Sequence, residues 1–366
     1  MKIVSIETFT IPQFGLVRIR TDNGYEGWGQ TAPNQHANIT SMVLHQQVGP
    51  YYLGADVSDM DRIGELAERC IVGEHKFPGS YVCRALAGID TALWDLHGKM
   101  QNKSVCELVG GKRKKLNVYG SSMSREITPE EEAARLKRLK EQYGYKAFKI
   151  RIGKPFGNDV DAWPGRTEKI VPMVREAIGD DTLLFVDANS GYTPKKAIEI
   201  AKWLEAHGVS HFEEPCPYPE LEWTREVKEA TSIPVAGGEQ DTDLAQFRRM
   251  IRMGAVDIVQ PDVCYVGGFS RALKVAKMAE EAGIPCTPHA ANLTMVTVFT
   301  MHLLAAIPNG GPYMEFCIED IPWSKGIYEP QLEVKDGAVE IPPGPGWGVE
   351  ICEDWLKRAE YRISHV

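Results

Sequence analysis

Three acidic residues, Asp187, Glu213 and Glu239, recur along the chain at equal intervals of 26 residues. Each stands at the end of a short apolar run and before a stretch with helical spacing, so each is predicted at the carboxyl end of a β-strand. In a set of parallel strands those ends lie on one face, where the three side chains can converge. Carboxylates are hard oxygen ligands of the kind that Mg²⁺ prefers. The spacing therefore predicts a magnesium site.

Other residues able to carry charge or protons stand at the remaining expected strand ends. Lys149 and Arg151 are two positions apart in one apolar run, so both side chains point to the same face of a strand. A buried pair of cations needs compensating anions, which the three acids and an anionic substrate would supply. Asp262 and His289 close two later runs, and an aspartate bonded to a histidine fixes its tautomer and raises its basicity. Glu315 lies on the last run. These residues indicate an acid–base site beside the metal site.

The elements that must position these side chains alternate between strand and helix from residue 116 onward. Eight strands are expected at 116–123, 147–153, 183–190, 211–215, 234–239, 257–263, 285–290 and 313–317. Eight strands alternating with helices favour an α/β fold with a closed parallel barrel. Thr128 before Pro129 and Thr193 before Pro194 are typical helix starts. In such a barrel the active site lies at the carboxyl ends of the strands.

The segments on either side of this repeat have different patterns. Residues 1 to about 27 alternate like the strands of a meander, and helical spacing follows from about 38 to 100, which indicates an α+β module over residues 1–112. The barrel is expected over residues 113–317. The tail, residues 318–366, is rich in proline and glycine and is expected to pack back on the N-terminal module.

Composition excludes several classes of protein. The chain has 366 residues, a net charge of −9 and a pI near 5.6, which argues against a nucleic-acid partner because such proteins carry basic patches. No apolar run approaches the roughly 18 residues that cross a membrane, and no apolar signal segment is visible at the N-terminus. The eight cysteines form no CxxC pair. Reduced thiols are typical of the cytoplasm, so we expect a cytoplasmic protein.

Seven short motifs follow one another in the chain: 85–95 (ALAGIDTALWD), 149–151 (KIR), 186–189 (VDAN), 212–215 (FEEP), 237–239 (GGE), 260–262 (QPD) and 288–289 (PH). In this order and at these spacings, the chain resembles the mandelate racemase subgroup of the enolase superfamily along essentially its full length. The resemblance implies a (β/α) barrel of modified TIM type, with an N-terminal α+β capping domain that closes over the barrel mouth.

The resemblance also implies a chemistry. Mg²⁺ would be held by Asp187, Glu213 and Glu239, and the pair of His289 and Asp262 would act as acid and base. Glu315 would hydrogen-bond one carboxylate oxygen of the substrate. The shared reaction of the family removes a proton next to a carboxylate and gives a metal-stabilised enediolate. The catalytic candidates are His289, Asp262, Lys149, Arg151 and Glu315.

Arg151 departs from the pattern of many family members, which carry a second lysine there as a base opposite the histidine. Arginine stays charged at neutral pH and is a poor proton acceptor. Racemisation needs a base on each face of the α-carbon, whereas dehydration can use His289 alone. The sequence therefore favours dehydration of a sugar acid, an aldonate or aldarate with a 2R hydroxyl, to a 2-keto-3-deoxy acid. A racemase or epimerase of the same fold, and a sugar-acid-binding protein with a degenerate site, remain alternatives.

Selection of the substrate must depend on the capping module. The first two strands are joined by only four residues, 12–15, where family members often carry a long lid. Segments 32–36 and 73–78 are the expected substitutes, and His36, Lys76 and Asn189 are the substrate-binding candidates. Glu214 is expected on the opposite face from Glu213. A homo-oligomer is expected from the resemblance.

Overall fold

The N-terminal part of the chain forms a sheet covered by helices. The computed structural model describes residues 1–33 and 35–366. An antiparallel sheet has the strand order β14-β1-β2-β3, and its strands are β1 (Ile3–Thr10), β2 (Gly15–Thr21), β3 (Glu26–Gln30) and, from the C-terminus, β14 (Glu360–His365). Its helices are α1 (Ala37–Val43), α2 (Asp61–Gly73), α3 (Ser80–Gln101) and α4 (Val105–Leu108).

Helix α3 is the core of this module, and β3 packs directly against it. A Cβ atom on Gly27 would lie 2.0 Å from the carbonyl oxygen of Ala92, and one on Gly29 would lie 2.3 Å from that of Gly88. Only glycine allows two backbones to approach so closely. The helical motif 85–95 thus carries the packing of the module.

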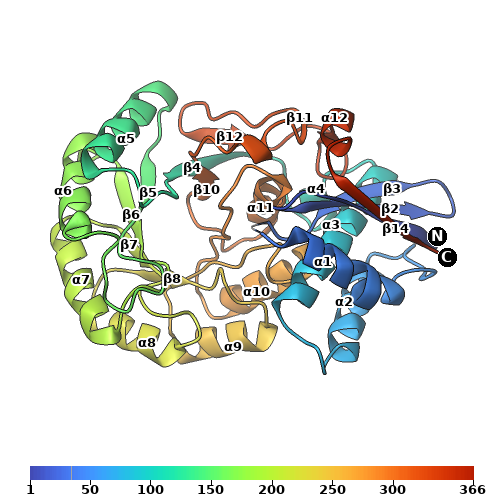
Figure 1. The fold of residues 1–366 in the computed structure, drawn as a ribbon, viewed down its shortest axis with the longest axis horizontal. Helices are drawn as coiled ribbons and strands as arrows, with labels where there is room; N and C mark the ends of the chain where they lie inside the picture. The colour runs from blue at the N-terminus through green and yellow to red at the C-terminus, as the bar shows by residue number, and fades with distance from the viewer. Residues whose placement is uncertain (34) are drawn as a thin grey trace.

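The second part of the chain is a parallel barrel. Its strands are β4 (Lys115–Ser121), β5 (Ala147–Arg151), β6 (Leu183–Asp187), β7 (His211–Glu213), β8 (Val235–Gly237), β9 (Ile258–Val259) and β10 (Met314–Cys317). The helices between them are α5 (Pro129–Tyr143), α6 (Arg166–Ile178), α7 (Pro194–Ala206), α8 (Leu221–Ala230), α9 (Leu244–Met253), α10 (Phe269–Glu281) and α11 (Met295–Ala306). In Figure 1, α5 to α9 form an arc around the strands. The expected α/β barrel with a capping module is confirmed.

The strands on the later side of the barrel are shorter than the sequence predicts. At the seventh position, expected as 285–290, only bridges form, from Cys286 to Val259 and to Gly310 and from His289 to Asp262. Proline has no backbone N–H to donate, and Pro285 and Pro288 both fall in this segment. The bridges of Cys286 nevertheless link β9 to Gly310, in the segment that leads into β10.

The tail returns from the barrel to the N-terminal module. After β11 (Tyr328–Glu329), β12 (Ala338–Glu340) pairs with β4, and β13 (Glu350–Ile351) pairs with β11. After the short α12 (Glu353–Leu356), β14 pairs antiparallel with β1, so the two termini lie side by side in Figure 1. No helix in residues 1–33 and 35–366 is long and apolar enough to cross a membrane.

Two buried aspartates of α3 tie the three parts of the chain together. Asp90 accepts a hydrogen bond of 3.1 Å from the backbone N–H of Ser270, in the first turn of α10. Asp95 accepts from the backbone N–H groups of Trp28, at 2.8 Å, and Trp347, at 3.0 Å, and pairs with Lys99 at 2.7 Å. The first aspartate thus joins the module to the barrel, and the second joins β3 to the tail.

Replacing Asp95 with alanine is expected to destabilise the whole protein. Two buried N–H groups and a partly buried ammonium group lose their acceptor, and breaking a buried pair on one side typically removes about 3–5 kcal/mol of stability. Chemical denaturation of the variant against the wild type measures this difference. The control is Asp354→Ala, whose side chain is 92% exposed beside Lys357. An Asp95→Ala protein that unfolds at the same denaturant concentration as this control would show that Asp95 does not stabilise the fold.

Candidate active site and metal centre

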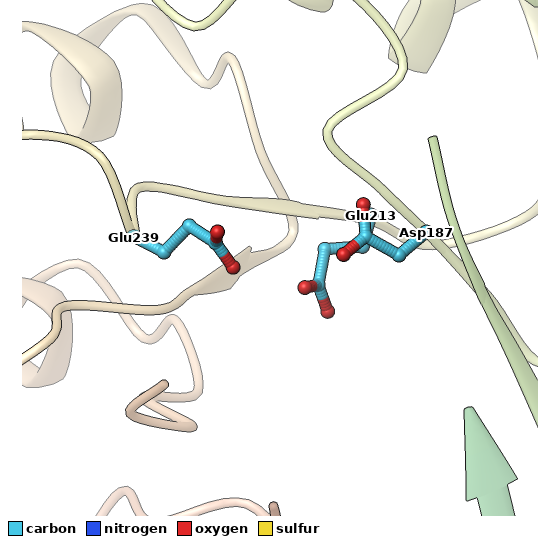
Figure 2. A group of neighbouring side chains, drawn as sticks. All are labelled: Asp187, Glu213 and Glu239. Carbon is cyan, nitrogen blue, oxygen red and sulfur yellow. The ribbon is translucent and has the colours of Figure 1, made fainter. Parts of the chain in front are cut away.

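Three carboxylates meet where β6, β7 and β8 end. Asp187 and Glu213 are the last residues of β6 and β7, and Glu239 follows β8 by two positions. One oxygen atom from each lies within 4.8 Å of the others, and Figure 2 shows the side chains of Asp187 and Glu213 close together with Glu239 turned toward them. All three are buried. Such a cluster of buried negative charge requires cations nearby.

Two cations of β5 supply part of the compensating positive charge. The ammonium nitrogen of Lys149 lies 2.5 Å from Glu213 Oε1 and 2.9 Å from Glu315 Oε1. Burial alone would lower the pKa of Lys149, but these two carboxylates raise it, so the side chain stays charged. Arg151 contacts Asp187 and donates hydrogen bonds to Asn189 Oδ1, at 3.2 Å, and to the backbone oxygen of Ser122. Both side chains face into the barrel, as their spacing predicts.

The carboxylate oxygens of the three acids are suited to bind a metal ion. Glu239 Oε2 is buried without a hydrogen-bond partner among the described residues. Burial and the charge of Glu213 raise the pKa of Glu239. In contrast, Lys149 holds the pKa of Glu213 well below its usual range despite burial. A buried carboxylate oxygen without a donor, beside two further carboxylates, is a donor set suited to a hard divalent cation. The residues present therefore fit Mg²⁺.

His289 and Asp262 form a bonded pair beside the carboxylates. His289 Nδ1 lies 2.7 Å from Asp262 Oδ2, and Asp262 Oδ1 accepts hydrogen bonds from the backbone N–H groups of Cys264 and Tyr265. The other ring nitrogen, Nε2, points toward Glu239 at 3.5 Å. Burial disfavours the charged ring, but Glu239, Glu315 and Asp262 together raise the pKa of His289 to about 10. The pair leaves Nε2 as the nitrogen that can exchange a proton with a substrate.

Glu315 lies between Lys149 and the histidine. Its Oε1 accepts a hydrogen bond of 2.7 Å from Ser121, and its Oε2 accepts one of 2.8 Å from the backbone N–H of Ala290. Burial opposes its ionisation, yet Lys149 and His289 lower the pKa of Glu315 to about 2. An ionised carboxylate only accepts hydrogen bonds. The role expected for Glu315, donation to a substrate carboxylate, therefore needs a proton gained when substrate binds.

The substrate-binding candidates differ in where they lie. Asn189 is in contact with the cluster: its amide nitrogen lies 3.1 Å from Asp187 Oδ2. His36 and Lys76 are exposed on the N-terminal module, and no hydrogen bond or ion pair joins either side chain to the barrel residues described above. Their proposed role in binding stays a prediction. Asn34, in the first of the two expected segments, lies outside the described residues.

Glu214 is an exception to the strand pattern. Its φ of 43° is left-handed, so the alternation that would place it opposite Glu213 ends there, and the prediction is wrong. The side chain is buried with Oε1 unpartnered among described residues. Burial and the charges of Glu239 and Glu213 raise its pKa well above the usual range. Glu214 therefore borders the carboxylate cluster, whose negative charge disfavours its ionised form.

Sequence reasoning missed several other side chains around the site. Gln260 donates a hydrogen bond of 2.7 Å to Glu213 Oε2, and His211 Nε2 lies 3.6 Å from the same oxygen, with its ring stacked on Phe185. His211 is the first residue of β7, two residues before Glu213. Period-two spacing from Glu213 would have placed it on the inner face.

Two family models match the chain, and they cover the two parts of the structure. Residues 2–110 match the "Mandelate racemase / muconate lactonizing enzyme, N-terminal domain", and residues 131–355 match the "Enolase C-terminal domain-like" model. The chain belongs to the mandelate racemase and muconate lactonizing enzyme family of the enolase superfamily. The resemblance inferred from the seven motifs is thereby confirmed.

Several relatives have known names or structures. The chain is 32% identical to D-galactarolactone cycloisomerase of Agrobacterium fabrum, over 95% of this chain and 91% of that protein. It is 29% identical to arabinonate dehydratase of Saccharolobus solfataricus, over 91% and 87%. The solved structure of a candidate racemase from Roseobacter denitrificans superimposes with a TM-score of 0.97 at 52% identity, covering all of both chains. A racemase from Streptomyces coelicolor, solved with bound magnesium, gives a TM-score of 0.83 at 26% identity, covering 98% of this chain and 99% of that one.

Proposed function

We propose that the protein is a Mg²⁺-dependent hydro-lyase that dehydrates a sugar acid, an aldonate or aldarate with a 2R hydroxyl, to a 2-keto-3-deoxy acid. One observation carries this proposal. A bonded histidine–aspartate pair, His289 and Asp262, lies beside the carboxylate cluster, while the position of a second base is occupied by Arg151, which contacts Asp187. One base suffices for dehydration but not for racemisation through a planar intermediate.

The metal ligands and Lys149 have separate roles in this reaction. Asp187, Glu213 and Glu239 would hold Mg²⁺. When bound, Mg²⁺ supplies positive charge that stabilises the substrate carboxylate as it gains negative charge and that offsets the carboxylates raising the pKa of His289. Lys149, which stays charged beside Glu213 and Glu315, adds a second positive charge.

His289 carries out the proton transfers. Nε2 takes the proton from C2 of the substrate, and Asp262 stabilises the resulting imidazolium through its bond to Nδ1. The same nitrogen then gives a proton to the hydroxyl group on C3, and the C3–O bond breaks with loss of water. The resulting enol becomes the 2-keto-3-deoxy acid when C3 takes up a proton. Arg151 remains protonated throughout and binds a substrate oxygen.

The names of the relatives support this class of reaction. Besides arabinonate dehydratase, similar proteins include D-xylonate dehydratase of Haloferax volcanii and L-talarate/galactarate dehydratase of Salmonella typhimurium, at 29% and 27% identity. The second candidate function is isomerisation, because the Agrobacterium relative is a cycloisomerase and the Roseobacter structure is a candidate racemase. These alternatives differ in whether water is lost.

A screen of products separates them. Purified protein with Mg²⁺ is incubated with a panel of aldonic and aldaric acids, and the products are identified by NMR. The proposal predicts a 2-keto-3-deoxy acid from one stereochemical series. Inversion at C2 without loss of water would move the function to racemase or epimerase. A panel in which nothing reacts, with or without Mg²⁺, would favour a binding protein.

Replacing Arg151 with lysine tests why the site favours dehydration. Lysine can lose its proton and act as a base on the face opposite His289, so the variant is expected to gain deuterium exchange at C2 of the 2S acid in D₂O. Dehydration should fall by about tenfold or more, since lysine cannot reproduce the bonds of the planar guanidinium group. NMR of both C2 epimers measures the two rates. A variant that leaves the 2S acid unexchanged would show that Arg151 does not decide between the reactions.

A further inference from the structure

Arg84, near the start of α3, lies over the histidine side of the barrel. The carbon of its guanidinium group is 3.7 Å from the centre of the Tyr265 ring, and that ring is centred 5.9 Å from the ring of His289. Arg84 Nη1 also donates a bond of 3.5 Å to the backbone oxygen of Pro33, which belongs to one of the two segments expected to select substrate. One aromatic ring thus separates a cation of the N-terminal module from His289.

The bonding of Arg84 differs from that of the other partly buried arginines. Among the described residues, no carboxylate lies within 4.0 Å of its guanidinium group, whereas Arg18, Arg135, Arg151 and Arg271 each have a carboxylate partner. The arginines that lack one are held instead by several backbone oxygens: Arg125, Arg166 and Arg175. Arg84 has one long bond to a backbone oxygen, so most of its five N–H groups are available.

The position of Arg84 matches the far end of a substrate. In the proposed reaction, C1 lies near Lys149 and C2 lies near His289, so the remaining carbons extend away from the carboxylate cluster. Because the guanidinium carbon lies 3.7 Å from the centre of the Tyr265 ring and that ring lies 5.9 Å from the ring of His289, Arg84 is within about 10 Å of the His289 ring. A hydrogen-bonded diacid of five or six carbons, with C–C bonds of about 1.5 Å each, spans a distance of this order. A guanidinium group forms its strongest and most specific bonds with a carboxylate, through two parallel N–H···O contacts.

We propose that Arg84 binds the distal carboxylate of the substrate and that the substrate is therefore a diacid, an aldarate. This inference rests on the proposed function, because it takes the orientation of the substrate from it. Tyr265 holds the guanidinium group through a cation–π contact, and the backbone oxygen of Pro33 accepts a long hydrogen bond from it, so both contacts orient the side chain before the substrate arrives. Arg84 acts on specificity and has no part in proton transfer.

Kinetics with matched substrates test the proposal. An aldarate and the aldonate of the same configuration are compared in the wild type, Arg84→Gln, Arg84→Lys and Lys103→Gln, the last being a change of an exposed cation of the same module. The wild type is expected to prefer the aldarate. Arg84→Gln should lower kcat/KM for the aldarate by about 10- to 100-fold, mainly through KM, and leave the aldonate nearly unchanged. Arg84→Lys should lose less, and Lys103→Gln should behave as the wild type.

Binding without turnover separates this proposal from the proposed function. The same two acids are titrated calorimetrically into His289→Asn protein with Mg²⁺, with and without Arg84→Gln. Tighter binding of the aldarate, lost in the double variant, supports the distal site even if the wild type dehydrates neither acid. A wild type that prefers the aldonate, an equal loss for both acids in Arg84→Gln, or equal binding of both acids to His289→Asn would overturn it.

Discussion

Replacing His289 with asparagine is expected to abolish dehydration and to stop exchange of the C2 proton with solvent. The asparagine amide can keep the hydrogen bond to Asp262, which now joins His289 Nδ1 at 2.7 Å, but it has no nitrogen in the position of Nε2. General acid–base catalysis by a positioned side chain is typically worth about 10²- to 10⁴-fold, and here one group serves as both base and acid. NMR in D₂O measures both the exchange and the product.

The matched control is His207→Asn. Among the described residues, the side chain of His207 forms a hydrogen bond only with the backbone oxygen of Trp203 in α7, so its replacement should leave the rate unchanged. Asp262→Asn should slow the reaction less than His289→Asn, since the base remains and only its tautomer and orientation are disturbed. A His289→Asn protein that still exchanges the C2 proton would exclude His289 as the base.

Replacing Glu239 with glutamine is expected to remove the response of the protein to Mg²⁺. In the wild type, an ion that binds only the folded protein raises the free energy of unfolding, by about 2.7 kcal/mol at a concentration 100 times its dissociation constant. The variant loses a charged ligand, so this stabilisation should disappear and activity should fall by more than about 100-fold. Thermal unfolding with Mg²⁺ and with a chelator measures the difference.

The stability of the Glu239→Gln variant in the absence of Mg²⁺ provides a separate check. Burial and the charge of Glu213 raise the pKa of Glu239 in the folded protein. At pH values above the pKa that Glu239 has in the unfolded protein, its ionised carboxylate therefore destabilises the folded state. Removing that charge should leave the chelated variant at least as stable as the chelated wild type near neutral pH. Glu222→Gln, an exposed change on α8, is the control. If Glu239→Gln kept the Mg²⁺ response, Glu239 would not be a ligand.

The repeat pattern predicted the fold because long-range order in this barrel follows from local periodicity. Apolar runs ending in an acid, followed by helical spacing, were enough to locate β5, β6, β7 and β8 and the helices after them. Strand lengths were not predictable in the same way. Pro285 and Pro288 lack N–H groups and reduce the seventh strand to bridges, although its apolar character and its place in the barrel are kept.

The candidate site was predictable where residue type and strand position together determine direction. Asp187, Lys149 and Arg151 face inward because strands alternate, and the structure brings them together. Glu214 was misplaced because a left-handed residue ends the alternation, which no residue type except glycine signals reliably. Arg84 was missed because its position over Tyr265 depends on how the N-terminal module docks on the barrel, and helix periodicity carries no information about docking.

The central claim is that the protein removes the C2 proton of a sugar acid and expels the C3 hydroxyl at the site of His289. The most direct test is NMR of the product formed by wild-type protein with Mg²⁺ in D₂O. We expect a 2-keto-3-deoxy acid that carries one deuterium at C3, because the enol takes its new proton from solvent or from an exchanged His289. A sugar acid recovered with deuterium and inverted configuration at C2, with no water lost, would contradict it.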